Sequence, residues 1–108
     1  GEQTRSFCYI DDCVEGLIRL MNSDWHDPIN LGQDRMITIN ELVAMVARIA
    51  GKQINIRHEL DRPLGVRGRN SDNSLLRKVL AWEPQISLEE GLEKTYAWIA
   101  AQVEPTAN

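Results

Sequence analysis

The sequence predicts an α/β fold of the mixed (α+β) kind, in which short strands are covered by about four helices. Three observations predict it. Apolar residues recur at helical spacing in four stretches, short β-prone runs stand between them, and turn or capping residues separate the two kinds of segment. The chain has 108 residues with no internal repeat and no linker, so it suits one domain with a single modest core.

The first expected strand covers residues 6–10, and the acidic pair Asp11 and Asp12 opens the helix that follows. Gly16 in the middle of this helix costs roughly 1 kcal/mol relative to Ala. It is either a point of close packing or simply tolerated. A second short strand is expected over residues 28–32. The apolar face of the helix is formed by Cys13, Val14, Leu17, Ile18 and Met21.

The next helix has the clearest sequence signal for its first turn. Thr38 and Glu41 have capping-box spacing, in which the hydroxyl accepts from the Glu41 amide and the carboxylate reaches back to residue 38. Gly51 is the expected left-handed terminator of this helix. Residues 54–58 then alternate apolar and polar side chains, which predicts a half-buried third strand.

Two helices complete the expected order of elements. One is capped by Asp72 and ends shortly before Pro84, which cannot continue it. The other begins at a second capping box, formed by Ser87 and Glu90, and has an apolar face of roughly four turns.

Between the third strand and the third helix lies an arginine-bearing loop, Gly65-Val66-Arg67-Gly68-Arg69-Asn70-Ser71-Asp72. The planar fork of an arginine can hold phosphate oxygens bidentately, and a helix start carries a partial positive charge. This combination predicts a diphosphate ligand. The alternative is a polar loop whose arginines pair with nearby carboxylates.

Composition narrows the possible partners. The chain is 43% hydrophobic and 26% charged, which is ordinary for a soluble globular protein, so we expect a cytoplasmic location. A net charge of −4 without a dense basic cluster argues against nucleic acid. No apolar run approaches the roughly 20 residues of a membrane span. Cys8 and Cys13 do not have zinc-site spacing, and we expect two reduced thiols packed in the interior.

Several catalytic signatures do not occur in the sequence. It has no glycine-rich dinucleotide turn, no Walker loop, no Gly-x-Ser-x-Gly elbow and no Tyr-x-x-x-Lys pair. We therefore assign no catalytic residue and no metal ligand, and whether the chain alone is an enzyme stays open.

Three segments together resemble a known family. They are Gln3-Thr4-Arg5-Ser6-Phe7 followed by Ile10-Asp11, then Ile29-Asn30-Leu31-Gly32, and then Gly65 to Asn73. In this order they are similar to the C-terminal part of the GDP-mannose 3,5-epimerase family, within the extended short-chain dehydrogenase/reductase group of NAD-dependent epimerases and dehydratases. The first segment is typical of the whole group, whereas Gly65 to Asn73 points to the GDP-mannose branch. The likeness extends to about residue 102.

The resemblance implies a small C-terminal substrate-binding domain over residues 1–103, a solvated tail over 104–108, and an N-terminal Rossmann domain that is not in this chain. That absent domain would bind NAD and supply the catalytic Tyr and Lys. By the resemblance, Gln3, Thr4 and Arg5 lie along the nucleotide diphosphate and Arg69 is the main phosphate ligand. Arg67 matches the motif but can also be structural, facing a carboxylate.

The sequence therefore predicts the substrate-binding part of an NAD-dependent nucleotide-sugar epimerase, most similar to the GDP-mannose 3,5-epimerase type. Its expected partners are a nucleotide-sugar and its own Rossmann domain, and family members often form homodimers. One alternative is the same domain of a UDP-sugar 4-epimerase or a dTDP-sugar dehydratase. Another is a free-standing interaction module without catalysis. The sequence does not indicate which sugar is processed.

Overall fold

The computed structural model describes residues 1–103. The described residues form four helices, α1 (Ile10–Met21), α2 (Ile39–Ala50), α3 (Ser74–Leu80) and α4 (Leu88–Val103), and one sheet of two short strands. These strands are β1 (Thr4–Arg5) and β2 (Ile37–Thr38), which pair antiparallel with Thr4 opposite Thr38 and Arg5 opposite Ile37. The mixed fold with about four helices is confirmed. The tail predicted over residues 104–108 lies outside the described part of the chain.

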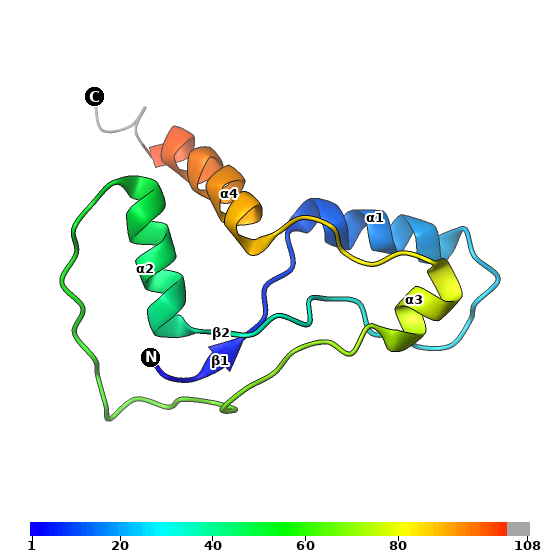
Figure 1. Ribbon diagram of the computed structural model, residues 1–108, viewed down its shortest axis with the longest axis horizontal. Coiled ribbons are helices and arrows are strands. Elements are labelled where there is room, and N and C mark those ends of the chain that lie inside the picture. The colour runs from blue at the N-terminus through cyan, green and yellow to red at the C-terminus, as the bar shows by residue number, and fades with distance from the viewer. Residues whose placement is uncertain (104–108) are drawn as a thin grey trace.

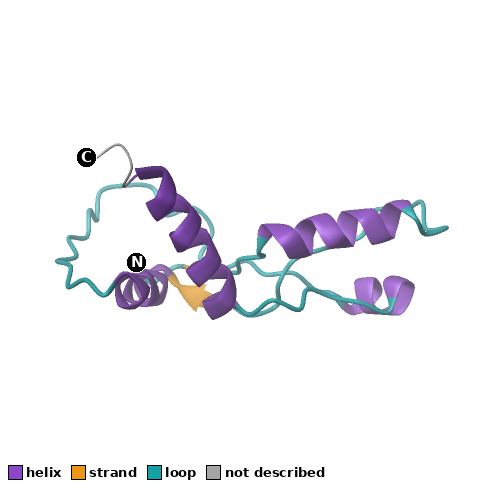
Figure 2. Ribbon diagram, turned by 90° about the horizontal axis from the view of Figure 1, so that it is seen from above, coloured by secondary structure: helices purple, strands orange, loops and turns teal. Residues whose placement is uncertain are grey.

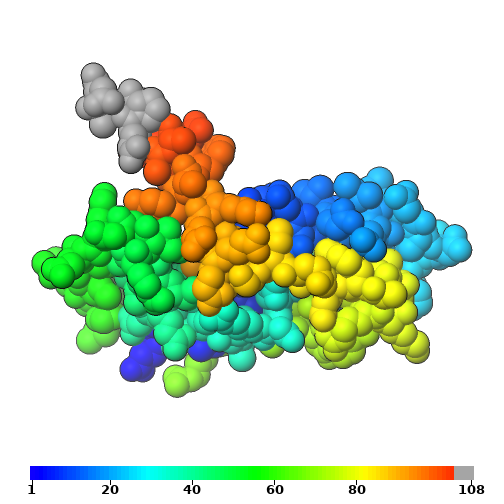
Figure 3. Space-filling view, turned by 45° about the horizontal axis from the view of Figure 1, so that its top comes forward, coloured from blue at the N-terminus to red at the C-terminus, as the bar shows by residue number. Residues whose placement is uncertain are grey.

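The molecule is flat and elongated, with α1 and α3 at one end and α2 and α4 at the other (Figure 1). The view from above shows the same two groups joined by long loops, with the sheet beside α2 and α4 (Figure 2). The radius of gyration is 16.8 Å, compared with about 13 Å for a compact domain of this length. In the space-filling view, α4 lies between the regions of α2 and α1 (Figure 3). The chain therefore has a thin core.

The buried apolar side chains of the described residues are Ile37 in β2, Leu76 in α3 and Pro84 before α4, and of these only Leu76 is fully buried. The apolar face of α1 is largely exposed, since Leu17 and Met21 keep 51% and 83% of their surface accessible. An amphipathic helix normally buries this face. Gly16, on the same helix, packs closely: a Cβ at this position would collide with the side chain of Leu31 and lie 3.0 Å from the Trp82 ring. Of the two interpretations of Gly16, close packing is therefore correct.

The start of α2 has the predicted capping box. The Glu41 amide donates to the Thr38 hydroxyl at 3.0 Å, and the Thr38 amide donates to the Glu41 carboxylate at 2.8 Å. Gly51 ends the helix with a φ of 67°, in the left-handed region. The box predicted for α4 is only half formed. The Glu90 amide donates to the Ser87 hydroxyl at 3.2 Å, while the Glu90 carboxylate pairs with Lys94 instead.

Removal of the complete box should cost more stability than removal of the half box. We expect the double variant Thr38→Ala/Glu41→Ala to lower the free energy of unfolding by about 1–2 kcal/mol, because the backbone amides of residues 38 and 41 both lose their side-chain acceptors. Ser87→Ala should cost clearly less, since it removes one bond. Urea unfolding followed by circular dichroism compares the two variants, and equal losses would contradict this account.

The three predicted strands are wrong in their positions. Residues 6–9 form no strand and Ile10 already belongs to α1, while residues 28–32 and 54–58 are also irregular. Strands need a partner of matching register. Residues 28–32 instead bond through single contacts to the loop before α3, and Ile54 is half exposed with no neighbouring strand among residues 1–103. The observed strands lie at 4–5 and 37–38, where the loop segments meet.

Candidate functional site

A hollow of about 420 Å³ opens where three segments meet, at the end of β1, at residues 30–33 and at residues 69–71. We call it the arginine hollow, because Arg5 and Arg69 are both among its lining residues. No carboxylate of residues 1–103 lines it, although the whole chain has a net charge of −4. The hollow is therefore a locally positive site on an acidic protein, which suits an anionic ligand.

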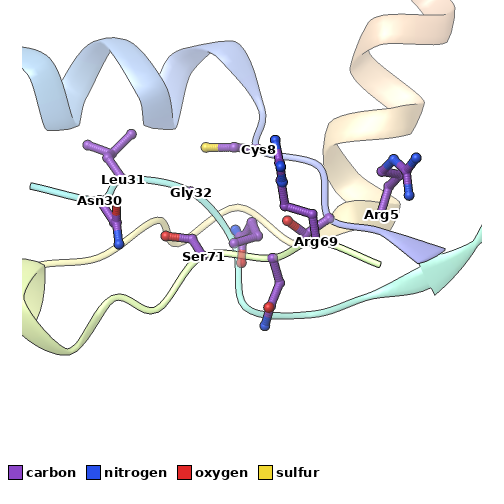
Figure 4. A pocket seen from close by; sticks show the side chains of 10 residues that line it. Arg5, Cys8, Asn30, Leu31, Gly32, Arg69 and Ser71 are labelled. Carbon is purple, nitrogen blue, oxygen red and sulfur yellow. The ribbon is translucent and has the colours of Figure 1, made fainter. Parts of the chain in front are cut away.

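The Arg69 guanidinium is free to bind a ligand. Within residues 1–103 it makes no hydrogen bond and no ion pair, and its side chain is exposed. In Figure 4 it extends from its loop toward the segment that carries Cys8. All five of its N–H donors therefore remain available, which is the geometry that bidentate phosphate binding requires.

Arg5 lines the same hollow, but its guanidinium already donates to backbone carbonyls. Its Nη1 donates to the carbonyls of Thr4 and Val66, each at 2.7 Å, and its Nη2 lies 3.4 Å from the carbonyl of Leu64. Gly65 between them has a φ of 70°, and a Cβ there would lie 3.3 Å from Arg5 Nη2. Arg5 thus fixes residues 64–66 to β1 and keeps only part of its donor set for a ligand.

Because Arg5 holds residues 64–66 against β1 like a strap, we expect Arg5→Lys to loosen this loop locally. A single ammonium cannot reproduce the fork that reaches carbonyls on two segments. We expect residues 64–67 to loosen and the Thr4 amide, which donates to the Arg67 carbonyl at 2.7 Å, to exchange with solvent about tenfold faster. The matched control, Arg57→Lys on the exposed part of the loop, should leave Thr4 exchange unchanged. Equal exchange in both variants would contradict the strap.

A second hollow of about 500 Å³ is bordered by residues 64–65, and its lining also includes Gln3, Asn40, His58 and Arg67. His58 Nε2 lies 3.0 Å from the Asn40 Oδ1. The Gln3 Oε1 is buried and has no hydrogen-bond partner within the described residues. The lining of this second hollow is mixed, because Leu60, Leu64 and the carboxylate of Glu2 border it beside these polar side chains.

The five predicted contacts are thus divided by the structure. Arg5 and Arg69 share the arginine hollow, whereas Gln3 and Arg67 line the second hollow. Thr4 lines neither of them, and its hydroxyl donates to the Arg67 carbonyl at 3.2 Å. Arg67 makes no ion pair with a carboxylate among residues 1–103. The role of all five as ligand contacts stays a prediction.

The start of α3 contributes less than the sequence suggested. Asp72 Oδ1 accepts from the Ser74 amide at 3.0 Å and from the Ser74 hydroxyl at 2.6 Å. These bonds lower the pKa of Asp72 below its ordinary value. Because a carboxylate already occupies the first amide of this seven-residue helix, the helix start is not a free anion site.

Cys8 lines the arginine hollow without adding charge to it. Burial, and then the neighbouring Cys13 and Asp12, raise the pKa of the Cys8 thiol above its ordinary value. The thiol therefore remains protonated near neutral pH, and the positive charge of the two guanidiniums is not offset. Both cysteines are free and half-buried, rather than fully interior as predicted.

The uncharged polar lining of the arginine hollow was not predicted from the sequence, and it is formed by Ser6, Asn30, Gln33, Asn70 and Ser71. The signal was present. Asn30, Asn70 and Ser71 stand in the segments on which the family resemblance depends. Amides and hydroxyls beside an arginine are the groups that complete a phosphate site.

Two findings limit the kinds of site elsewhere in residues 1–103. No group of three or more His, Cys, Asp or Glu side chains is gathered so that it could hold a metal ion. None of the helices is long and apolar enough to cross a membrane.

Comparison with known proteins now adds the family. A family model described as GDP-mannose 4,6 dehydratase matches residues 1–95. The chain is 50% identical to the GDP-mannose 3,5-epimerase of Arabidopsis thaliana over 96% of its own length and 27% of that protein. The chain thus spans about a quarter of the curated relatives it matches. The resemblance to the GDP-mannose branch that the sequence predicted is confirmed.

Solved structures show the same fold. The structure of UDP-glucose 4-epimerase with UDP-glucose from Thermotoga maritima matches with a TM-score of 0.89 and 30% identity, over 95% of this chain and 33% of that one. The UDP-glucuronic acid 4-epimerase of Bacillus cereus, in complex with UDP-glucuronic acid and NAD, matches with a TM-score of 0.85 and 30% identity, over 94% and 33%.

Proposed function

The chain belongs to the GDP-mannose 4,6 dehydratase family, and from this premise we propose that it is the nucleotide-sugar-binding part of an NAD-dependent epimerase. GDP-mannose is the substrate class that we propose, since the Arabidopsis relative at 50% identity is a GDP-mannose 3,5-epimerase. The arginine hollow would hold the diphosphate, with Arg69 as its main ligand.

One observation carries this proposal: two arginines, and no carboxylate of residues 1–103, line the same hollow. A diphosphate brings about two negative charges, and each charge-assisted hydrogen bond contributes about 1.5–3 kcal/mol net. The free Arg69 fork supplies such bonds, and Arg5 adds charge while it fixes the adjacent loop. Binding of the non-reacting diphosphate orients the sugar for the chemistry, so this energy serves catalysis as well as affinity.

NAD and the groups that act on the sugar would come from a Rossmann part corresponding to the remaining length of the relatives. The Bacillus cereus relative was solved with NAD and UDP-glucuronic acid, which supports this division of labour. The exposed apolar face of α1, with Leu17 and Met21, supports it too, because a neighbouring domain would cover that face. The cytoplasmic location and the homodimer stay predictions.

A UDP-sugar 4-epimerase is the second candidate function. It is favoured by the match to the Thermotoga maritima enzyme, which holds UDP-glucose and shares 30% identity with this chain. Both candidates use the arginine hollow for a diphosphate and differ only in the base and the sugar.

The test is a titration of the chain with GDP-mannose, followed by NMR of the backbone amides. Amides of Gly32, Arg69 and Ser71 should shift at millimolar ligand, whereas guanosine, which has no phosphate, should leave them unchanged. UDP-glucose at the same concentrations separates the two candidates, since stronger binding of it would favour the 4-epimerase. Equal shifts with guanosine would remove the diphosphate assignment.

A further inference from the structure

Asn73 connects two of the three segments that line the arginine hollow. We call these two segments, residues 30–33 and residues 69–71, its walls. Asn73 is buried, with 3% of its surface exposed, and it is not part of the lining. Its Nδ2 donates to the Gly32 carbonyl at 2.8 Å, and its Oδ1 accepts from the Ser71 hydroxyl at 2.7 Å. Gly32 and Ser71 themselves line the hollow, from opposite segments. One buried amide thus bonds to both walls.

The helix does not use this amide. Asn73 stands at the N-cap position of α3, where an asparagine side chain normally accepts from a helix amide. Here it makes no capping bond, and Asp72 binds the Ser74 amide in its place. The Asn73 side chain is therefore free to bond outside the helix, and both of its polar atoms bond to residues that line the hollow.

Gly32 and Ser71, the two residues that Asn73 joins, are closely packed against each other. The Ser71 amide donates to the Gln33 carbonyl at 2.9 Å, beside the Asn73 bonds. A Cβ on Gly32 would lie 3.0 Å from the Ser71 Cβ, so the two walls already approach as closely as a glycine allows. Loss of a buried partner leaves desolvated polar groups behind, which favours separation of the walls.

We propose that Asn73 is a positioning residue, which sets the spacing of residues 30–33 and 69–71 and thereby places Arg69 for the anion. Arg69 stands only two residues before Ser71, so movement of that wall displaces the guanidinium. The part that concerns the ligand rests on the proposed function, while the clamp itself does not depend on any ligand.

The test is Asn73→Ala in the full chain, with two measurements. Hydrogen exchange of the Ser71 amide should become at least about tenfold faster, and the Kd for GDP should rise about tenfold. Exchange of the Ala81 amide, which bonds to the Arg77 carbonyl at the end of α3, should stay unchanged. Unchanged Ser71 exchange, or unchanged GDP affinity in a chain that binds GDP, would overturn the proposal.

Ser74→Ala is the matched control. It removes a 2.6 Å hydrogen bond at the start of α3 without a change of charge and without contact to the hollow. Ser71 exchange and GDP affinity should remain as in the unsubstituted chain, and an effect equal to that of Asn73→Ala would reduce Asn73 to a helix-stabilising residue.

Two further outcomes are distinguishable. If Asn73→Ala does not fold, Asn73→Asp keeps the acceptor for Ser71 but sets a carboxylate oxygen against the Gly32 carbonyl, and it should show the same faster exchange. If the unsubstituted chain does not respond to GDP, the proposed function fails and the Ser71 exchange alone decides whether Asn73 clamps the walls.

Discussion

Arg69→Ala is expected to weaken GDP binding by about 10- to 100-fold, which corresponds to the about 1.5–3 kcal/mol of a charge-assisted hydrogen bond. The size of the effect follows from the free state of the side chain. Because Arg69 has no partner among residues 1–103, its substitution breaks no internal bond, and the loss should appear in binding alone. Calorimetric titration with GDP measures it, and thermal unfolding should show little change.

Arg57→Ala is the control for the change in net charge. Arg57 belongs to the same long loop, its side chain is 86% exposed, and it pairs only with Glu59. Its substitution removes one positive charge from the chain, as Arg69→Ala does, at a residue that does not line the arginine hollow. If both variants lose affinity equally, the anion responds to overall charge, and the assignment of Arg69 as the phosphate ligand is wrong.

Leu76→Ala should be the most destabilising single substitution in the chain. Leu76 is the one large side chain of residues 1–103 that is completely buried. Truncation of a buried leucine costs about 2–5 kcal/mol, and a thin core has few other contacts to compensate. We expect this variant to be largely unfolded at 37 °C, as measured by urea unfolding and by circular dichroism.

Leu75→Ala separates burial from helix propensity. Leu75 is the preceding residue of α3 and remains 37% exposed, so the same chemical change removes much less buried surface. The loss of unfolding free energy should be clearly smaller than for Leu76→Ala. Comparable losses would show that α3 does not anchor this end of the molecule, and the description of the core would have to change.

The helices were predictable from the sequence because their signals are local. The capping box of Thr38 and Glu41 and the terminator Gly51 each act within one turn of the helix that they delimit. The start of α4 shows where this local reasoning stops. Glu90 has the correct spacing for a box, but Lys94 one turn later competes for its carboxylate.

The strands were not predictable in the same way. Ile54 and Ile56 alternate with polar residues as a half-buried strand does, yet both remain about half exposed. A strand depends on hydrogen-bond partners that its own sequence does not contain. The pairing of Thr4 with Thr38 joins segments 34 residues apart, and no pattern within either segment announces it.

The candidate site was predictable in its charge and only partly in its geometry. Arg69 could be identified from its loop, and the family resemblance placed it beside Arg5. The Arg5 guanidinium instead donates to the carbonyls of Thr4 and Val66. These bonds depend on the fold of a glycine-bearing loop, which the sequence does not specify. The role of Asn73 was not predictable either. Its position predicts a helix cap, whereas its side chain donates to the Gly32 carbonyl 41 residues away.

The central claim is that a nucleotide diphosphate binds at the free guanidinium of Arg69. The most direct measurement follows the Nε–Hε NMR signals of the arginine side chains during titration with GDP. The account predicts a large saturable shift for Arg69, a smaller one for Arg5, and none for Arg57. A silent Arg69 signal at millimolar GDP, or equal small drifts of all arginine signals, would contradict it.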